Sequence, residues 1–247
     1  MITLIIPCRN EAGTISDILN FAVKLPGVSQ ILVIDGNSED GTFRMAQEVI
    51  VNFSLISNLK IDIFTQHNKG KWDAVLLGIE NSFNNYISIW DADLTVSFTE
   101  QSLIHERFLS SIKHRGTPCL SMGERMSHRE PGSMRFFNFL GNFLFAKIWS
   151  LMCKTDIKDM LCGSKIFAST VLDQVPQSVL RIDPYGDFSI VLGSILKGYP
   201  IETQTLTYRA RTYGQTNILR WSGAYALFKV SILSFYFIRK KNVNRMV

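Results

Sequence analysis

The chain has 247 residues, of which 46% are apolar and 19% charged, and this balance predicts a globular α/β protein and argues against a disordered one. Its four cysteines show no CxxC or Cys/His spacing, which argues against a zinc module, and the N-terminal stretch lacks the long apolar core of a signal peptide. We therefore expect a reducing, cytoplasmic location.

Charge is distributed unevenly along the chain. Residues 203–247 contain eight basic and no acidic residues, whereas residues 1–202 hold 18 Lys/Arg against 21 Asp/Glu, so the net charge of +5 comes from the C-terminal part. Such an end suits anionic phosphates or an anionic lipid surface, with a solvated basic terminus as the alternative. Nucleic acid is the weaker candidate, because no recognised nucleic-acid module accompanies these residues.

Hydrophobic periodicity predicts an α/β fold in the first half of the chain. Between short β-rich runs, apolar residues recur at i, i+3, i+4 and i+7 from Ile15 to Ala22, and Pro26 stops this helical pattern. Strands that alternate with helices imply a mostly parallel sheet with right-handed crossovers. The β-rich runs, buried on both faces, are at residues 2–6, 31–34, 61–64 and 86–90.

Three polar clusters follow these strands, at residues 7–11, 35–38 and 91–95. Ligands of parallel sheets bind outside the carboxyl ends of the strands, so we expect the clusters to meet there. In the third cluster Asp91 and Asp93 are separated by one residue, a spacing that lets two carboxylates hold a divalent cation against a diphosphate. The spacing alone is also common in solvated turns, and the remaining motifs decide between the two interpretations.

Several ordered motifs resemble one known family. The runs IIPCRNE, ILVIDGNSEDGT, NKGKWDAVLLGI and WDADLT look like the nucleotide-binding half of a family 2 glycosyltransferase of GT-A fold, close to the polyprenyl-phosphate (dolichol-phosphate) sugar synthase branch. The runs KDMLCGSKIF and DPYGDFSIVLGSILKGYPIETQTLTYRARTYGQTNILRW are similar to its second half. The resemblance implies a glycosyltransferase domain at 1–218, divided into a nucleotide half (1–98) and an acceptor half (99–218), with a basic, apolar helix at 219–247.

The resemblance also implies roles for individual residues. Gly36, Trp72 and Thr95 depart from the family pattern and put neighbouring contacts in question. The alternatives to these binding roles are a purely structural turn at 7–11, an exposed Lys71 without a ligand, and ordinary surface arginines. The nucleotide sugar would be bound by Pro7, Asn10, Glu11, Asp35, Lys71, Asp91 and Arg211, with Gly214, Gln215, Thr216 and Asn217 completing a mobile loop.

On the acceptor side, Asp187 matches the family's acidic residue. A hydroxyl acceptor would need Asp187 as general base, whereas an anionic lipid phosphate would need it only for orientation. Asp91 and Asp93 would bind Mg²⁺ or Mn²⁺, which acts as a Lewis acid on the leaving diphosphate, so Asp93 and Asp187 are the expected catalytic residues. Acceptor contacts are expected from Arg125, Arg135 and Arg209.

Two apolar stretches, at 136–152 and 223–238, fall short of the roughly twenty residues that a membrane span requires. Their flanking cations fit helices that lie in a membrane interface, and core or partner-facing helices are the alternative.

The sequence therefore predicts an inverting, metal-dependent hexosyltransferase. It would transfer a sugar from a nucleotide diphosphate to a polyprenyl phosphate at the cytoplasmic membrane face. A soluble hydroxyl-acceptor enzyme of polysaccharide synthesis and a degenerate nucleotide- or lipid-binding partner subunit are the alternatives. A sugar-phosphate nucleotidyltransferase is disfavoured, because its glycine-rich N-terminal loop is missing where IIPCRNE stands.

Overall fold

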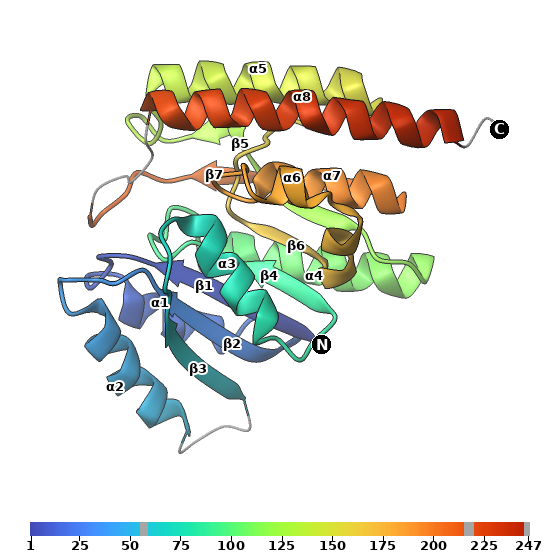
Figure 1. The fold of residues 1–247 in the computed structure, drawn as a ribbon. Helices are drawn as coiled ribbons and strands as arrows, with labels where there is room; N and C mark the ends of the chain where they lie inside the picture. The colour runs from blue at the N-terminus through green and yellow to red at the C-terminus, as the bar shows by residue number, and fades with distance from the viewer. Residues whose placement is uncertain (55–58, 215–219, 245–247) are drawn as a thin grey trace.

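The computed structural model describes residues 1–54, 59–214 and 220–244, which form a sheet with helices on both faces (Figure 1). The strand order is β3-β2-β1-β4-β6-β5-β7, and every neighbouring pair is parallel except that β6 runs antiparallel to β4 and β5. The predicted mostly parallel α/β sheet is confirmed. The strands are β1 (Ile2–Cys8), β2 (Val28–Asp35), β3 (Lys60–Thr65), β4 (Tyr86–Ile89), β5 (Leu120–Arg129), β6 (Lys165–Ala168) and β7 (Ile201–Tyr208).

Helices cover the sheet in two layers, each over its own apolar core. One core is made with α1, α2 and α4, and the other with α3, α5, α7 and α8. The predicted first helix is confirmed, because its four periodic apolar residues are all buried. The helices are α1 (Ile15–Ala22), α2 (Thr42–Ser54), α3 (Lys71–Glu80), α4 (Phe98–Arg115), α5 (Phe136–Cys153), α6 (Gln177–Leu180), α7 (Asp187–Lys197) and α8 (Arg220–Asn244), with a 3₁₀ turn at Ser169–Gln174.

The predicted strands are found, with shifted ends. The fourth strand ends at Ile89, one residue before the predicted end. The next residue, Trp90, belongs to the turn that follows the strand. Its backbone nitrogen still donates to Ile5 O at 3.1 Å, while its buried indole nitrogen donates to Val96 O at 3.1 Å. Trp90 therefore closes the turn that carries the two aspartates.

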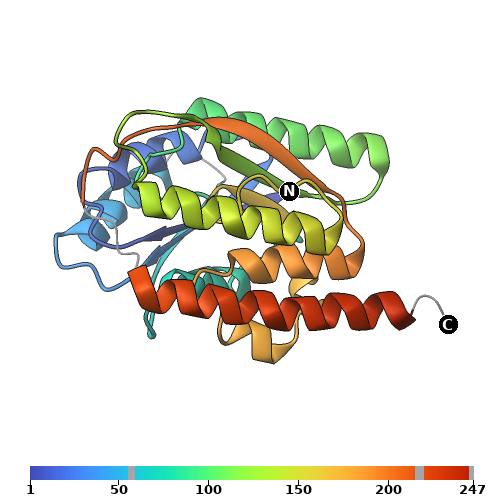
Figure 2. The same ribbon diagram turned by 90° about the horizontal axis from the view of Figure 1, so that it is seen from above.

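Helices α5 and α8 lie side by side on the outside of the second layer (Figures 1 and 2). The Trp149 indole on α5 donates to Ser231 Oγ on α8 at 3.0 Å. The sequence placed both stretches below the length of a span. By length and composition alone, the 18-residue helix α5 is long and apolar enough to cross a membrane. The prediction that its stretch is too short for a span is therefore corrected. The apolar stretch at 223–238 is part of the 25-residue helix α8.

A buried histidine fastens α4 to the sheet. His105 Nε2 lies 2.9 Å from Ser88 Oγ on β4, and Nδ1 lies 3.0 Å from the carbonyl oxygen of Pro26. Burial lowers the pKa of His105 from 6.5 to about 4, so the folded protein holds this ring neutral.

The sign of the resulting pH dependence follows from that shift. Between pH 6.5 and about 4 the unfolded chain binds a proton at His105 that the folded chain does not. The contribution of His105 to stability therefore decreases as the pH is lowered through this window. We expect His105 to contribute a loss of about 3 kcal/mol in the free energy of unfolding. It is measured by urea titration at several pH values as the difference between the parent and His105→Gln, because Glu11, whose pKa is raised to about 7, changes stability in the opposite direction over much of this window. Replacing the exposed His67 by Gln is the control and should leave the pH dependence of stability as it is in the parent.

Candidate active site

The loops after β1 and β2 are bound to each other at the carboxyl edge of the sheet. Asn10, in the left-handed conformation with φ of 57°, donates its backbone N–H to Ser38 Oγ, and its side-chain oxygen accepts from Glu39 N, both at 2.9 Å. Glu11 N donates to Thr42 Oγ1 at 2.9 Å. Asn10 thus has a structural role that the sequence did not predict, and its binding to the nucleotide sugar stays a prediction.

Asp35 ends β2 and lies buried beneath these loops. Its carboxylate accepts from Ser38 N at 3.1 Å, which shapes the turn after the strand. The next residue is Gly36, where a Cβ atom would lie 3.2 Å from Arg9 Cβ and 3.3 Å from Cys8 O. A side chain at this position, where the family has a second acid, would require the first loop to shift by a few tenths of an ångström.

The two aspartates after β4 each bind a cationic side chain. Asp91 Oδ1 lies 2.5 Å from Lys71 Nζ at the start of α3, and Asp93 Oδ2 accepts from Arg211 Nη2 at 2.7 Å. Burial alone would raise the pKa of Asp91, but the Lys71 ammonium outweighs it and holds that pKa below its usual value. Thr95 donates its N–H and its hydroxyl to Asp93 Oδ1, at 3.1 and 2.8 Å, and so orients that carboxylate.

Arg211 also joins this cluster to the first loop. Its Nη1 donates to Glu11 Oε1 at 2.7 Å, so one guanidinium bridges Glu11 and Asp93. Burial raises the pKa of Glu11 to about 7, against the lowering effect of Arg211. Tyr213 lies over Gly13, where a Cβ atom would be 2.4 Å from the ring, and its hydroxyl donates to Asp40 at 3.3 Å.

On the other side of the site, a turn at the start of α7 presents Asp187. The Asp183 carboxylate accepts from Gly186 N at 2.9 Å and from Ser189 N at 2.7 Å, which fixes this turn. Gly186 is in the left-handed conformation with φ of 79°, and a Cβ atom there would lie 1.9 Å from the Trp72 ring. Trp72, a departure from the family pattern, is therefore accommodated by glycine at 186.

Asp187 is paired with a lysine that the sequence analysis did not single out. Lys165 is completely buried, and its Nζ donates to Asp187 Oδ1 at 2.6 Å and to the carbonyl oxygens of Met160 and Cys162. A signal was available, because Lys165 is the one charged residue in the four-residue strand β6. The segment whose carbonyl groups bind Lys165 continues to Gly163, where a Cβ atom would lie 1.9 Å from Asp91 Oδ2. Lys165 thus links both sides of the site.

The three arginines predicted for the acceptor lie in different surroundings. Arg125 forms a paired contact with the buried Asp159, at 2.7 Å from Nε and 3.0 Å from Nη2, so its charge is already balanced. Arg135 precedes α5 and is exposed. Arg209 is exposed as well, and its backbone nitrogen donates to Thr95 O at 3.0 Å beside Asp93. Gln215, Thr216 and Asn217 lie outside the described residues.

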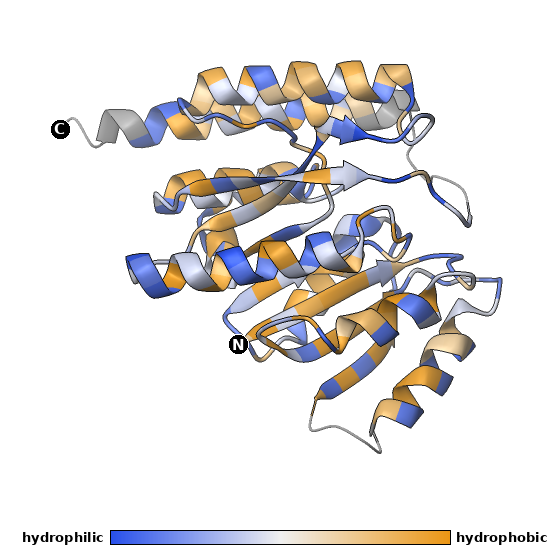
Figure 3. Cartoon of the chain, turned by 180° about the vertical axis from the view of Figure 1, so that it is seen from behind, coloured by the Kyte–Doolittle hydropathy of each residue, from blue (hydrophilic) through white to orange (hydrophobic). Residues whose placement is uncertain are grey.

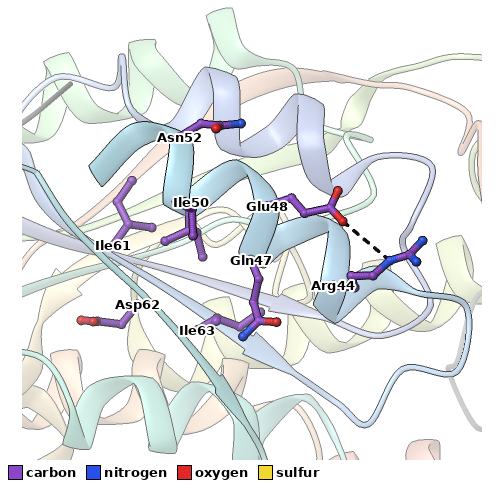
Figure 4. Close-up of a pocket in the computed structure, with 9 residues that line it drawn as sticks. Arg44, Gln47, Glu48, Ile50, Asn52, Ile61, Asp62 and Ile63 are labelled. Atoms are coloured by element: carbon purple, nitrogen blue, oxygen red, sulfur yellow. Dashed lines mark ion pairs between the residues drawn. The ribbon is translucent and has the colours of Figure 1, made fainter. Parts of the chain in front are cut away.

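A small cavity adjoins the two aspartates. It is bordered by Arg125, Tyr208 and Ser164, and the buried Ser164 hydroxyl has no hydrogen-bond partner among the described residues. A larger groove lies elsewhere, between α2 and β3, and its lining residues come from these two elements only (Figure 4). The lining of that groove contains none of the residues predicted for the site.

The carboxylates fit a magnesium-type or manganese-type cation. Asp91 and Asp93 supply hard oxygen atoms, but the described parts of the chain contain no group of three His, Cys, Asp or Glu residues that could hold a metal alone. Mg²⁺ is typically held by one or two carboxylates together with substrate phosphates and water. The donor set therefore fits a cation shared with a bound diphosphate.

Comparisons with known proteins show what this chain and its fold are similar to. Residues 3–104 match the family model described as Glycosyl transferase family 2. Over 95% of the chain, the fold matches glucosyl-3-phosphoglycerate synthase from Mycobacterium tuberculosis, solved in complex with Mn²⁺, uridine diphosphate and phosphoglyceric acid. The TM-score is 0.63 at 14% identity, and 78% of that structure is covered. The fold is therefore GT-A, as the sequence predicted.

Two curated proteins are similar to this chain in sequence. Glycosyltransferase AglJ of Haloferax volcanii is 26% identical over 167 residues, which cover 67% of this chain and 50% of the relative. Dolichyl-phosphate beta-glucosyltransferase of Dictyostelium discoideum is 27% identical over 179 residues, which cover 67% of this chain and 53% of the relative. The chain thus spans about half the length of these relatives.

Proposed function

We propose that the chain is an inverting, metal-dependent hexosyltransferase that transfers a sugar from a nucleotide-diphosphate donor to a lipid phosphate, a polyprenyl phosphate, at the cytoplasmic membrane face. The observation that carries the proposal is the set of charged side chains gathered at the carboxyl edge of the sheet. Glu11, Asp91 and Asp93 lie there with Lys71 and Arg211 bound to them. These cationic side chains suit a diphosphate, and the two aspartates suit its cation.

In this mechanism, each residue has a defined task. Lys71 and the Arg211 fork would bind the diphosphate, and Asp91 and Asp93 would hold Mg²⁺ or Mn²⁺. The cation supplies Lewis-acid stabilisation of the leaving nucleotide diphosphate. The relative named as a dolichyl-phosphate glucosyltransferase supports a lipid-phosphate acceptor, and the Mn²⁺ complex of the structural neighbour supports a divalent cation.

The surroundings of Asp187 favour a phosphate over a hydroxyl acceptor. A hydroxyl nucleophile must lose its proton to a base, whereas a phosphate oxygen is already anionic. One oxygen of Asp187 is held by the Lys165 ammonium, which limits its service as a base. We infer that Asp187 positions the acceptor.

The direct test is a transfer assay that combines UDP-sugars and GDP-sugars with a short polyprenyl phosphate and Mn²⁺ or Mg²⁺. We expect sugar to appear on the lipid phosphate, with none when the matching polyprenol replaces it. Transfer to the alcohol or to an oligosaccharide, but not to the phosphate, would favour the soluble polysaccharide enzyme. Binding of nucleotide without any transfer would favour the partner subunit.

Replacing Asp187 by Asn tests the acceptor class. The amide oxygen can still accept from Lys165, so a phosphate-acceptor enzyme should lose less than about tenfold in turnover, mainly through weaker use of the acceptor. Loss of a general base would instead reduce turnover by about 10² to 10⁴. Steady-state kinetics with varied acceptor distinguish the two, provided that thermal unfolding shows the variant folded.

The membrane part of the proposal rests on the outer surface of α5 and α8. Large apolar side chains are exposed along both helices. Figure 3, which colours the chain by hydropathy, shows that hydrophobic residues make up much of both helices. Three exposed cations lie over exposed aromatic rings of these helices, namely Lys147 over Phe143, Lys229 over Tyr225 and Arg239 over Phe235. Apolar faces flanked by cations are typical of helices in a membrane interface. The exposed apolar residues are Phe136, Phe137, Leu140, Phe143, Leu144, Ile148, Leu151, Tyr225, Phe228, Ile232, Phe235 and Tyr236.

Liposome sedimentation tests this surface. We expect binding to vesicles with anionic lipid at low salt and partial release at high salt, since each cation near the leaflet contributes about 1 kcal/mol. Charge reversal of Arg239 and Lys240 should weaken binding to the anionic vesicles. Lys241 is not replaced, because its side chain donates to the carbonyl oxygens of Ile195 and Leu196 on α7.

A second variant separates apolar insertion from charge. Replacing Phe137 and Leu151, which are 82% and 81% exposed, by Ser should also reduce sedimentation. Replacing the exposed Phe83, which lies outside these helices, by Ser is the control. Equal binding to neutral and anionic vesicles, or binding to neither, would contradict the proposal.

A further inference from the structure

Every carboxylate oxygen of Asp93 is already engaged by a donor. Thr95 donates two hydrogen bonds to Oδ1, and Arg211 donates to Oδ2 at 2.7 Å. The side chain of Asp93 is only 10% exposed, and that of Arg211 is 27% exposed. Oδ2 thus carries a positively charged donor, and a cation that binds this oxygen is repelled by the Arg211 guanidinium unless the guanidinium moves away. Arg211 is the one to move, because the Thr95 contacts are formed within the same short turn.

The segment that carries Arg211 is fastened across the same edge of the sheet. Arg209 N donates to Thr95 O at 3.0 Å, and Ala210 N donates to Glu130 Oε2 at 2.9 Å. Further along, Arg211 reaches Glu11, and Tyr213 packs on Gly13. These contacts fix the backbone on either side of Arg211, so its guanidinium lies between Glu11 of the first loop and Asp93.

We propose that Arg211 is an internal counter-ion that competes with the divalent cation for Asp93, so that the cation binds together with the nucleotide diphosphate. This inference deepens the proposed function and rests on it. A cation arriving alone meets a carboxylate that a guanidinium already neutralises, and Lys71 neutralises Asp91 beside it. A diphosphate offers the Arg211 fork an alternative partner of matching geometry. Transfer of the fork from Asp93 to the diphosphate frees Oδ2 for the cation.

The test measures Mn²⁺ binding by electron paramagnetic resonance on the full chain without nucleotide. Arg211→Gln should bind Mn²⁺ about tenfold more tightly than the parent, the size expected when a charge-assisted contact no longer competes. Arg209→Gln removes the same charge two residues away and should change affinity less than about twofold. With UDP or GDP added, the parent should gain more affinity than Arg211→Gln does, because only the parent can transfer its guanidinium.

A double variant tests whether the tighter Mn²⁺ site is at Asp93. Arg211→Gln combined with Asp93→Asn should lose the gain, which assigns the tighter site to Asp93. A gain that survives in the double variant, equal gains in Arg209→Gln and Arg211→Gln, or no Mn²⁺ binding by Arg211→Gln would each overturn the inference. Failure of the proposed function is distinguished separately, because the transfer assay on the parent protein does not depend on the order in which cation and nucleotide bind.

Discussion

Asp93→Asn is expected to reduce sugar transfer by about 10²-fold or more, the largest effect on activity of any single change considered for this chain. The change removes an anionic ligand, so the cation binds more weakly and the charge on the leaving diphosphate is less well neutralised. Removal of one such electrostatic contact from a transition state typically costs several kcal/mol. Turnover would be measured at saturating donor over a range of Mn²⁺ and Mg²⁺ concentrations.

The fold should tolerate this change, since the amide oxygen of the substituted side chain can still accept from Thr95. Circular dichroism and thermal unfolding would check this point. Asp62→Asn, on the edge strand β3 and away from the site, is the matched control and should retain activity. Unchanged turnover in Asp93→Asn, or full activity of the parent protein in chelator, would contradict the assignment of a metal site.

The sequence was sufficient to predict the elements around the donor side of the site. Strands β1, β2 and β4 are buried on both faces, so their apolar runs stand out, and the polar residues that follow them had to meet at one edge. The structure does bring Glu11, Asp91, Asp93, Lys71 and Arg211 together. Arg211 is 200 residues away from Glu11 along the chain, and only the resemblance linked them.

What could not be predicted depends on contacts between distant segments. Arg125 carries a charge that suits a phosphate, yet Asp159 neutralises it, and no local pattern connects these two residues. The pairing of Lys165 with Asp187 brings together β6 and α7, again through the tertiary fold.

Lys165→Met is expected to lower the free energy of unfolding by about 3 to 5 kcal/mol, the largest effect on stability. Loss of the ammonium leaves the buried Asp187 carboxylate and two carbonyl oxygens without their donor, and breaking a buried ion pair from one side typically costs this much. Urea unfolding would measure the change. Lys158→Met, whose side chain is 53% exposed and 4.0 Å from Asp156, is the control and should stay within about 0.5 kcal/mol.

A double variant shows whether the uncompensated charge is the cause. Lys165→Met combined with Asp187→Asn removes both charges, so it should be more stable than Lys165→Met alone. Turnover of Lys165→Met at a temperature where it stays folded should also fall, because the same ammonium holds the segment whose Gly163 packs on Asp91. A loss of stability below about 1 kcal/mol would mean that Asp187 finds water or Lys71 as a substitute partner, and that Lys165 does not fix the acceptor side of the site.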